Sequence, residues 1–284
     1  MNVLPDAVNA MSHILCRGLL GAVLLSTASA LPASALEVIG HRGRLQPTQI
    51  ENDLHQMQAT AAAGFGIELD LRRSRDGTLW VLHDDTLDRS TNGHGAIAER
   101  RDAELASLRL RAQDGQLSGE PLPRFESVAA WAARTPKLRL LLDLKTTRAT
   151  EVLPLLQRYG LGSRVILLSF DHAQAEEALH NGGGARVSVL VTHVQDIADY
   201  RRLAAGRPLA LYLPQAAPPA LFEAAHASGL PVISDALPLR QGQSLDARAA
   251  HEGCIAYAQF LATHPVDVLV SDTPGCAQAG AHPS

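Results

Sequence analysis

Two acids and a histidine fall within one short stretch of this sequence, residues 67–89. Apolar and acidic residues alternate at its start, so a strand there would place Glu68 and Asp70 on one face and the aliphatic side chains on the other. A turn at Gly77 followed by a second extended run predicts a hairpin that returns His83 to the two acids. Alone, such an acidic pair usually belongs to a solvated strand face. A functional site therefore requires matching groups elsewhere.

The elements that would position these groups alternate between strands and helices. Short apolar runs predict eight strands, at residues 36–40, 67–71, 138–144, 165–169, 186–191, 208–213, 231–234 and 266–270. Ala- and Leu-rich segments between them predict helices. This alternation favours a parallel α/β sheet, and eight units favour closure into a (β/α)₈ TIM barrel with a small insertion, residues 85–122, after the second strand.

Polar residues cluster where the predicted strands end. In barrels of this kind the chemistry lies at the carboxyl ends of the strands. Those ends carry Gly40-His41-Arg42-Gly43, Glu68 and Asp70, Asp143 and Lys145, Ser169-Phe170-Asp171, Thr192-His193, Ser234-Asp235 and Ser271-Asp272. The sequence thus predicts a ring of acids and histidines at one end of the barrel.

The residue types in this ring suit a metal-assisted reaction of a phosphate. Glu68, Asp70 and Asp143 offer only oxygen ligands, which favours Mg²⁺ or Ca²⁺ over a structural zinc ion. An unperturbed histidine side chain has a pKa of about 6.5, so of His41 and His83 one can accept a proton while the other donates one. We therefore predict a metal site and an acid/base pair.

Three further residues are candidates for binding and support. Arg42 can hold a phosphate with its planar fork of donors. Lys145 is read equally well as a phosphate or carboxylate partner and as a structural ion pair with Asp143. Glu51 either orients a catalytic group or caps the helix that follows it.

These motifs resemble the glycerophosphodiester phosphodiesterase family over most of the chain. The resemblance is carried by His41-Arg42-Gly43, Glu51-Asn52, Glu68-x-Asp70, Asp76-Gly77, His83-Asp84, Asp88-Arg89, Leu122-Pro123 to Glu126, Ser169-Phe170 and Ser271-Asp272-Thr273-Pro274. It implies a barrel enzyme that uses a divalent metal to cleave a small-molecule glycerophosphodiester into an alcohol and glycerol 3-phosphate.

The sequence also departs from that family pattern. Ile50 and Asp53 stand where the family has Pro and Thr, and Asp143 takes the place of a glutamate that the resemblance makes the third metal ligand. The tryptophan and asparagine usual on the seventh strand are missing near residues 231–236. These changes bear on the shape of the substrate pocket more than on metal binding.

Two other functions remain open at this point. A phospholipase D-like or sphingomyelinase D-like lyase on the same barrel would release a cyclic phosphate. An aspartate as the third metal ligand, at Asp143, resembles those lyases. A non-enzymatic binding protein is disfavoured by the presence of both histidines and all three acids. Because residues 85–122 are charged and rich in glycine, we expect them to cover the mouth as an open, wettable lid, which favours hydrolysis of a water-soluble diester.

The first 35 residues read as a secretory signal rather than as fold. Arg17 precedes a short apolar run, and small residues end at Ala35. The run is too short to span a membrane, so we expect no stable membrane anchor and an exported, periplasmic or secreted protein. The remaining residues, 36–284, are predicted to form a single domain. The formal net charge of −4 and the absence of a basic run argue against nucleic acid.

Cys254 and Cys276 are the cysteines that would remain after cleavage of the signal. In an oxidising compartment they can form a disulfide, although two buried free thiols are an equally good reading.

Overall fold

A computed structural model describes residues 36–282 of the chain. They belong to one compact unit, Ala35–Ser284. The predicted signal segment, residues 1–35, lies outside the described residues. Within residues 36–282, no helix combines the length and the apolar character that a membrane span requires.

Eight parallel strands form the centre of this unit and close into a barrel, as predicted. In chain order they are β1 (Glu37–Gly40), β2 (Gly66–Arg73), β6 (Leu140–Asp143), β7 (Val165–Ser169), β8 (Arg186–Leu190), β9 (Leu209–Tyr212), β10 (Val232–Asp235) and β11 (Val268–Ser271). Neighbours in the barrel are neighbours in this order, and the pairing of Gly40 with Ile67 joins β1 to β2. The opposite side of β1 pairs with β11, which completes the ring.

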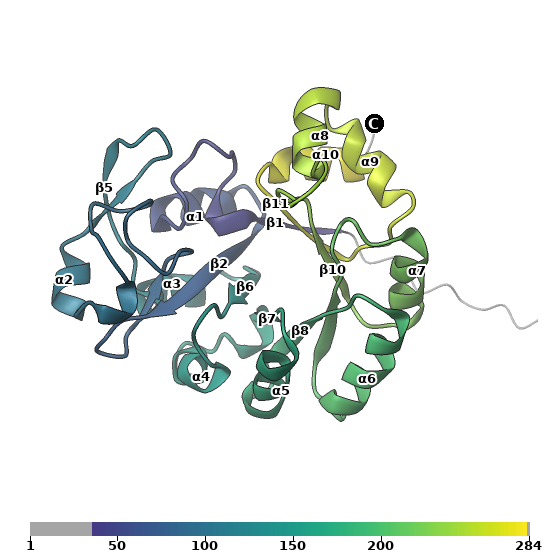
Figure 1. The fold of residues 1–284 in the computed structure, drawn as a ribbon, viewed down its shortest axis with the longest axis horizontal. Helices are drawn as coiled ribbons and strands as arrows, with labels where there is room; N and C mark the ends of the chain where they lie inside the picture. Colours follow the sequence, from purple (N-terminus) through teal and green to yellow (C-terminus); the bar gives the residue numbers. More distant parts are fainter. Residues whose placement is uncertain (1–35, 283–284) are drawn as a thin grey trace, which may run out of the picture. The chain divides into compact units, whose positions relative to one another are not determined.

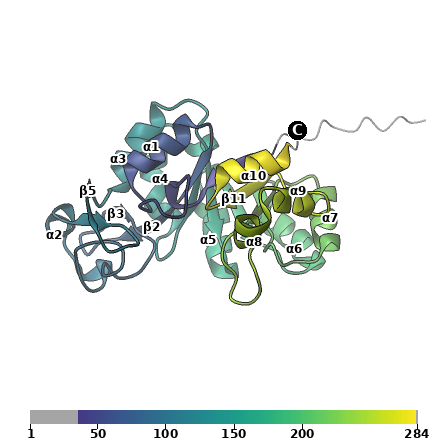
Figure 2. The ribbon, with the colours of Figure 1, turned by 90° about the horizontal axis from the view of Figure 1, so that it is seen from above.

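Helices cover the outside of the barrel. Figure 1 shows α4 to α7 along its outer rim, and Figure 2 shows α8, α9 and α10 gathered beside β11. The helices are α1 (Leu54–Ala62), α3 (Phe125–Ala133), α4 (Ala149–Arg158), α5 (His172–Asn181), α6 (Val194–Ala204), α7 (Pro219–Ala227), α8 (Leu245–Glu252), α9 (Ile255–Leu261) and α10 (Pro274–Ala281).

The alternation of side chains along each strand divides the apolar core into two parts. Outward-facing residues, such as Ile67 and Leu69 of β2, pack against the helices in the larger cluster. A smaller cluster, which includes Ile39 and Leu141, belongs to the opposite, inner faces of the strands. This alternation places Glu68 and Asp70 on the inner face of β2, because they lie between residues of the outer cluster.

The insertion after β2 is more ordered than its polar composition predicts. The chain enters it from β3 (Leu79–Val81), which pairs antiparallel with β2, and the insertion contains α2 (Asp102–Ala106) and a hairpin of β4 (Arg109–Arg111) and β5 (Leu117–Pro121). The predicted hairpin of residues 67–82 is confirmed, but the second hairpin was not expected.

This insertion also has an apolar core of its own, which the prediction of an open, wettable connection missed. Leu87, Ile97 and Leu110 are among its buried members, and Trp80 of β3 packs with them. In both views the insertion lies beside β2, away from α6 and α7. Its function as a lid over the barrel mouth stays a prediction.

Cys254 and Cys276 are joined by a disulfide, which decides between the two readings of the sequence. Cys254 directly precedes α9 and Cys276 lies in α10, with 5.1 Å between their Cα atoms. The bridge spans 22 positions in the sequence, so loop closure alone predicts a contribution of about 3 kcal/mol to stability. It fastens the final helix to the helix before it.

Candidate active site

Three buried carboxylates converge at the carboxyl ends of β2 and β6. The side chains of Glu68, Asp70 and Asp143 each offer an oxygen, and these oxygens lie within 4.8 Å of one another. Asp70 and Asp143 are direct partners in the parallel register of the two strands, which explains why they meet. All three side chains are almost inaccessible to water.

The electrostatics of this cluster suit a bound cation. Burial, and next the charge of Asp70, raise the pKa of Glu68 to about 7. Burial also opposes ionisation of Asp70, but the charges of Lys145 and Arg42 hold the pKa of that carboxyl below its ordinary value. A purely carboxylate donor set is what hard divalent cations prefer, so the residues present fit Mg²⁺ or Ca²⁺.

Lys145 bridges two of the three acids. Its Nζ lies 2.6 Å from Oδ2 of Asp143 and 3.1 Å from Oδ1 of Asp70. Burial would lower the pKa of Lys145, but Asp70 and Asp143 raise it above its usual value, which keeps the ammonium charged. The structural ion pair expected from the sequence is therefore present, and it also places a fixed positive charge at the cluster.

Arg42 lies against the same cluster from the turn after β1. Its backbone N–H donates to Oε2 of Glu68 at 3.0 Å, and its Nε lies 3.6 Å from Oδ2 of Asp70. The turn is tight: Arg42 has φ of 52°, and the following Gly43, with φ of 74°, leaves no room for a side chain against Met57. The Nε of Arg42 is buried and has no hydrogen-bond acceptor among the described residues.

Glu51 forms ion pairs with two arginines and does not cap the helix that follows it. Its carboxylate accepts from Arg42 at 2.9 Å and from Arg89 at 2.6 Å. Burial would raise the pKa of Glu51, but these two guanidinium groups hold it below its ordinary value. Asp53 is instead the residue that caps α1, by accepting from the backbone N–H of His55. Of the two roles considered for Glu51, the contacts agree with orientation of a neighbouring residue.

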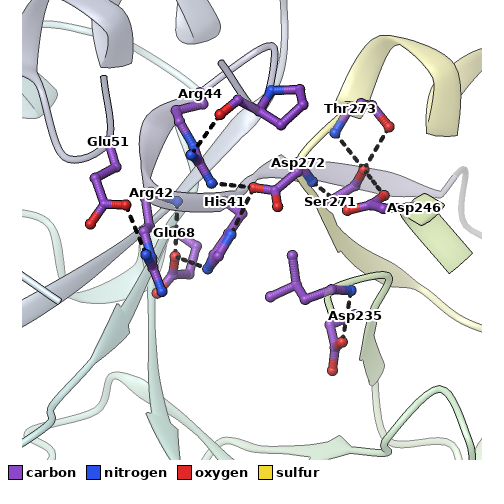
Figure 3. A network of polar contacts seen from close by, with 12 residues as sticks. His41, Arg42, Arg44, Glu51, Glu68, Asp235, Asp246, Ser271, Asp272 and Thr273 are labelled. Carbon is purple, nitrogen blue, oxygen red and sulfur yellow. Dashed lines mark hydrogen bonds and ion pairs between the residues drawn. The ribbon is translucent and has the colours of Figure 1, made fainter. Parts of the chain in front are cut away.

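His41 is held by an acid from the far end of the chain. Its Nδ1 lies 2.9 Å from Oδ1 of Asp272, and its Nε2 lies 3.9 Å from Oε2 of Glu68 (Figure 3). Arg44 donates to the same Asp272 oxygen at 2.5 Å. Burial would raise the pKa of Asp272, but His41 and Arg44 keep it below its usual range. The imidazole is thus oriented with Nε2 toward the acidic cluster.

His83 has a similar partner close in sequence. Its Nδ1 lies 2.7 Å from Oδ1 of Asp84, and the Nε of Arg89 donates to Oδ2 of the same carboxylate at 2.6 Å. Burial lowers the pKa of His83, although the negative charge of Asp70 and the bond to Asp84 act in the opposite direction. The carbonyl of His83 accepts two hydrogen bonds from Arg72, which fixes the backbone at this position.

All eight predicted site residues lie in one connected network. Glu51, Arg42 and Glu68 are linked directly, as are Asp70, Asp143 and Lys145. His41 adjoins Glu68, and the charge of His83 acts on Asp70. A cluster of this composition can bind a cation and an anionic group together, with two imidazoles available for proton transfer.

Several supporting residues were not assigned a function from the sequence. Asp272 was noted as a strand end and as part of a motif, Asp84 and Arg89 only as parts of a motif, and Arg44 not at all. Their signal in the sequence is weak, because single charged residues after strands are usually solvated. The barrel geometry reveals them, since it pairs β1 with β11.

Comparison with known proteins is consistent with this architecture. The model of the glycerophosphoryl diester phosphodiesterase family matches residues 40–275. A curated glycerophosphodiester phosphodiesterase of Caldanaerobacter subterraneus is 29% identical over 143 residues, which cover 48% of this chain and 58% of that protein. The match thus spans little more than half of this relative.

Solved structures share the fold over most of the chain. A glycerophosphoryl diester phosphodiesterase from Parabacteroides distasonis superposes with a TM-score of 0.74 at 23% identity, covering 89% of this chain and 87% of that one. A phosphodiesterase of Oleispira antarctica, solved with its product sn-glycerol-3-phosphate, gives 0.63 at 21% identity, covering 86% and 96%. At these identities the similarity shows the fold, and it confirms the predicted TIM barrel.

Proposed function

Since this chain belongs to the glycerophosphoryl diester phosphodiesterase family, we propose that it hydrolyses glycerophosphodiesters to an alcohol and glycerol 3-phosphate. The observation that carries the proposal is the buried cluster of Glu68, Asp70 and Asp143 beside two histidines, each with a carboxylate on its Nδ1. Names of the relatives, and the glycerol phosphate product in one of their structures, support the same substrate class.

Glu68, Asp70 and Asp143 would hold one divalent cation, Mg²⁺ or Ca²⁺. When bound, the cation neutralises charge on a phosphate oxygen and makes the phosphorus easier to attack. Its charge would also favour the ionised form of Glu68, whose pKa burial, and next the charge of Asp70, raise in the protein alone.

Arg42 and Lys145 would bind the phosphate of the substrate. Arg42 is suited because its buried Nε still has a hydrogen bond to donate, while Glu51 holds the other side of the guanidinium group. Lys145 supplies a charged ammonium that Asp70 and Asp143 keep in place. Both groups lie against the acids that would carry the cation.

His41 and His83 would move the protons. In a glycerophosphodiester the hydroxyl next to the ester lies close to phosphorus, so its attack is favoured by proximity. One imidazole accepts the hydroxyl proton as the new P–O bond forms, and the other donates a proton to the oxygen of the departing alcohol as the old P–O bond breaks. Water then opens the cyclic phosphate, which gives linear glycerol 3-phosphate.

We also propose that the protein is exported. The predicted signal in residues 1–35 motivates this location, and the Cys254–Cys276 disulfide supports it because such bonds persist in oxidising compartments. Detection of the mature chain in the periplasm or medium, beginning near Leu36, tests the proposal. Retention of full-length protein in the cytoplasm would contradict it.

The test of activity follows the phosphorus resonance of glycerophosphocholine by ³¹P NMR, with Mg²⁺, with Ca²⁺ and with chelator. We expect glycerol 3-phosphate as the final product and dependence on the added cation. A persistent cyclic phosphate, or strong preference for lysophosphatidylcholine, would assign the protein to the lyases instead. No turnover of either substrate with either cation would refute the proposed function.

A further inference from the structure

A partly buried carboxylate, that of Asp246, lies behind the pair of His41 and Asp272. Asp246, near the start of α8, directs its side chain at the turn that joins β11 to α10 (Figure 3). Its Oδ2 accepts the backbone N–H of Asp272 at 2.8 Å. Its Oδ1 accepts from the hydroxyl of Ser271 at 2.8 Å and also from the hydroxyl of Tyr257.

The turn around Asp272 is held from several sides by this group of residues. The backbone N–H of Thr273 donates to the hydroxyl of Ser271 at 2.9 Å, and the hydroxyls of Thr273 and Tyr257 lie 2.9 Å apart. Residues 271–273 are therefore fixed relative to α8 and α9. The side chain of Asp272 extends from this fixed turn to Nδ1 of His41.

A carboxylate that is partly removed from water loses some of its hydration, which is costly. Burial raises the pKa of Asp246, against the opposing hydrogen bonds from Tyr257, Asp272 and Ser271. A buried charge is retained only where donors compensate its lost hydration. Here three donors converge on one side chain, and one of them is the backbone of the residue that orients His41.

We propose that Asp246 is a positioning residue for the reaction. By accepting the N–H of Asp272, it fixes the turn from which Asp272 holds His41 with Nε2 toward the acidic cluster. This inference rests on the proposed function, because His41 is one of its proton-transfer groups. Asp246 acts through Asp272 and does not itself take part in the chemistry.

The alternative is that Asp246 only fastens α8 to α9 through Tyr257. The two roles use different oxygens of the same carboxylate, so different substitutions separate them. Tyr257→Phe removes the hydroxyl contacts with Asp246, Ser271 and Thr273 and leaves the bond from Asp272 N–H to Oδ2. It is therefore the matched control for a purely structural contribution.

Steady-state kinetics on glycerophosphocholine then test the role. We expect Asp246→Ala to lower kcat about tenfold or more, because small displacements of a catalytic group are costly, and to leave KM within about twofold. In Asp246→Asn the side-chain carbonyl oxygen can still accept from Asp272 N–H. The hydroxyls of Ser271 and Tyr257 can turn to accept from the new amide group. We therefore expect this variant to keep most of the wild-type kcat. Tyr257→Phe should lower the melting temperature and keep kcat within about twofold.

A double variant tests whether Asp246 acts through Asp272. If it does, Asp246→Ala combined with Asp272→Ala loses no more activity than Asp272→Ala alone. Multiplying losses would overturn the inference, and so would normal kcat in a folded Asp246→Ala protein or an equal loss in Tyr257→Phe. Should Asp246→Ala fail to fold, Asp246→Glu keeps the charge but displaces the acceptor, and it should show the same loss of kcat.

One measurement needs no turnover and so separates this inference from the proposed function. The Nδ1–H proton of His41 should give a downfield ¹H NMR signal, assigned by its loss in His41→Ala. We expect Asp246→Ala to shift or broaden this signal and Tyr257→Phe to preserve it. If the wild-type protein turns over no diester but the signal changes as expected, the proposed function fails and the positioning role stands. An unchanged signal in Asp246→Ala overturns the role.

Discussion

The Nδ1 of His41 lies 2.9 Å from Oδ1 of Asp272, although 231 positions separate the two residues in the chain. They meet because β1 and β11 pair in parallel, with Gly40 opposite Ser271. The carboxylate selects the imidazole tautomer in which Nδ1 carries the proton and Nε2 is free.

Asp272→Asn should therefore reduce kcat by about 10² or more, because an amide does not hold the imidazole in this tautomer or stabilise its charged form. The measurement is steady-state kinetics on glycerophosphocholine. Asp196→Asn is the matched control, since Asp196 also follows a barrel strand but serves the backbone of Thr192 and His193. A normal rate in Asp272→Asn would remove the carboxylate from the mechanism.

Each histidine should be needed for turnover. His41→Ala and His83→Ala should each lower the rate by about 10² or more, and the double variant should lose much less than the product, since the two groups act in one step. His94→Ala is the control, because His94 makes a comparable contact with Asp88, at 3.1 Å, on the exposed surface. A variant of either site histidine with near-normal turnover excludes that residue.

Removal of the metal should abolish activity reversibly and lower stability. The acids of the cluster repel one another without a cation, so a bound cation stabilises the folded protein. Chelation followed by dialysis should lower the melting temperature, and added Mg²⁺ or Ca²⁺ should raise it again. In Asp143→Asn this dependence should weaken. Full activity and an unchanged melting temperature after chelation would show that the three-carboxylate assignment is wrong.

The raised pKa of Glu68 predicts a dependence of stability on pH in the chelated protein. The pKa is about 7 in the folded protein against an ordinary value of 4.5, so between these values the folded state binds more protons than the unfolded state. The stability contributed by the neutral carboxyl is complete below about pH 4.5 and is lost as pH rises through about 7. The melting temperature of Glu68→Gln relative to wild type should therefore rise across this interval.

A saturating cation serves as the control for that measurement. Since it favours the ionised carboxylate in the wild-type protein, it should reverse the advantage of Glu68→Gln at pH 7 and above. A constant difference between the two chelated proteins from pH 4.5 to 8 would contradict the raised pKa.

Loss of the disulfide should destabilise the protein without removing any group of the site. Replacing Cys254 and Cys276 together by serine should lower the melting temperature by roughly 6–12 °C, from a loss of about 3 kcal/mol. Differential scanning calorimetry of oxidised, reduced and substituted protein measures this effect. Equal melting temperatures for all three would show that the bridge adds nothing.

The barrel, the three acids of the candidate site and His83 could be predicted from the sequence because their signals are local. Alternation within residues 67–71 places Glu68 and Asp70 on one face, and the turn at Gly77 returns His83 to them. The rule that chemistry lies at the carboxyl ends of barrel strands added Asp143, which β6 places opposite Asp70. Each of these inferences needs only a strand, a turn or a neighbouring strand.

The supporting residues could not be predicted because their contacts join distant segments. Nothing near Asp246 indicates that it lies under the turn of Asp272, since α8 must first pack against α9 and β11. The core of the insertion was also missed, because its apolar residues are spaced singly among charges and glycines. The composition of that segment indicates that many of its side chains are exposed. It does not predict that Trp80 and Leu110 pack in one buried cluster.

Because β1 pairs with β11, the orientation of His41 depends on a residue near the carboxyl end of the chain, Asp272. A polypeptide cut after Val270 would retain Glu68, Asp70, Asp143 and both histidines, yet it would lack the acid that orients His41. Proteolytic trimming or premature termination near the carboxyl end would thus yield a product with an intact ligand set and a misdirected imidazole. During biosynthesis the same dependence predicts that the protein stays inactive until β11 has docked, and under the proposed export that step would follow translocation.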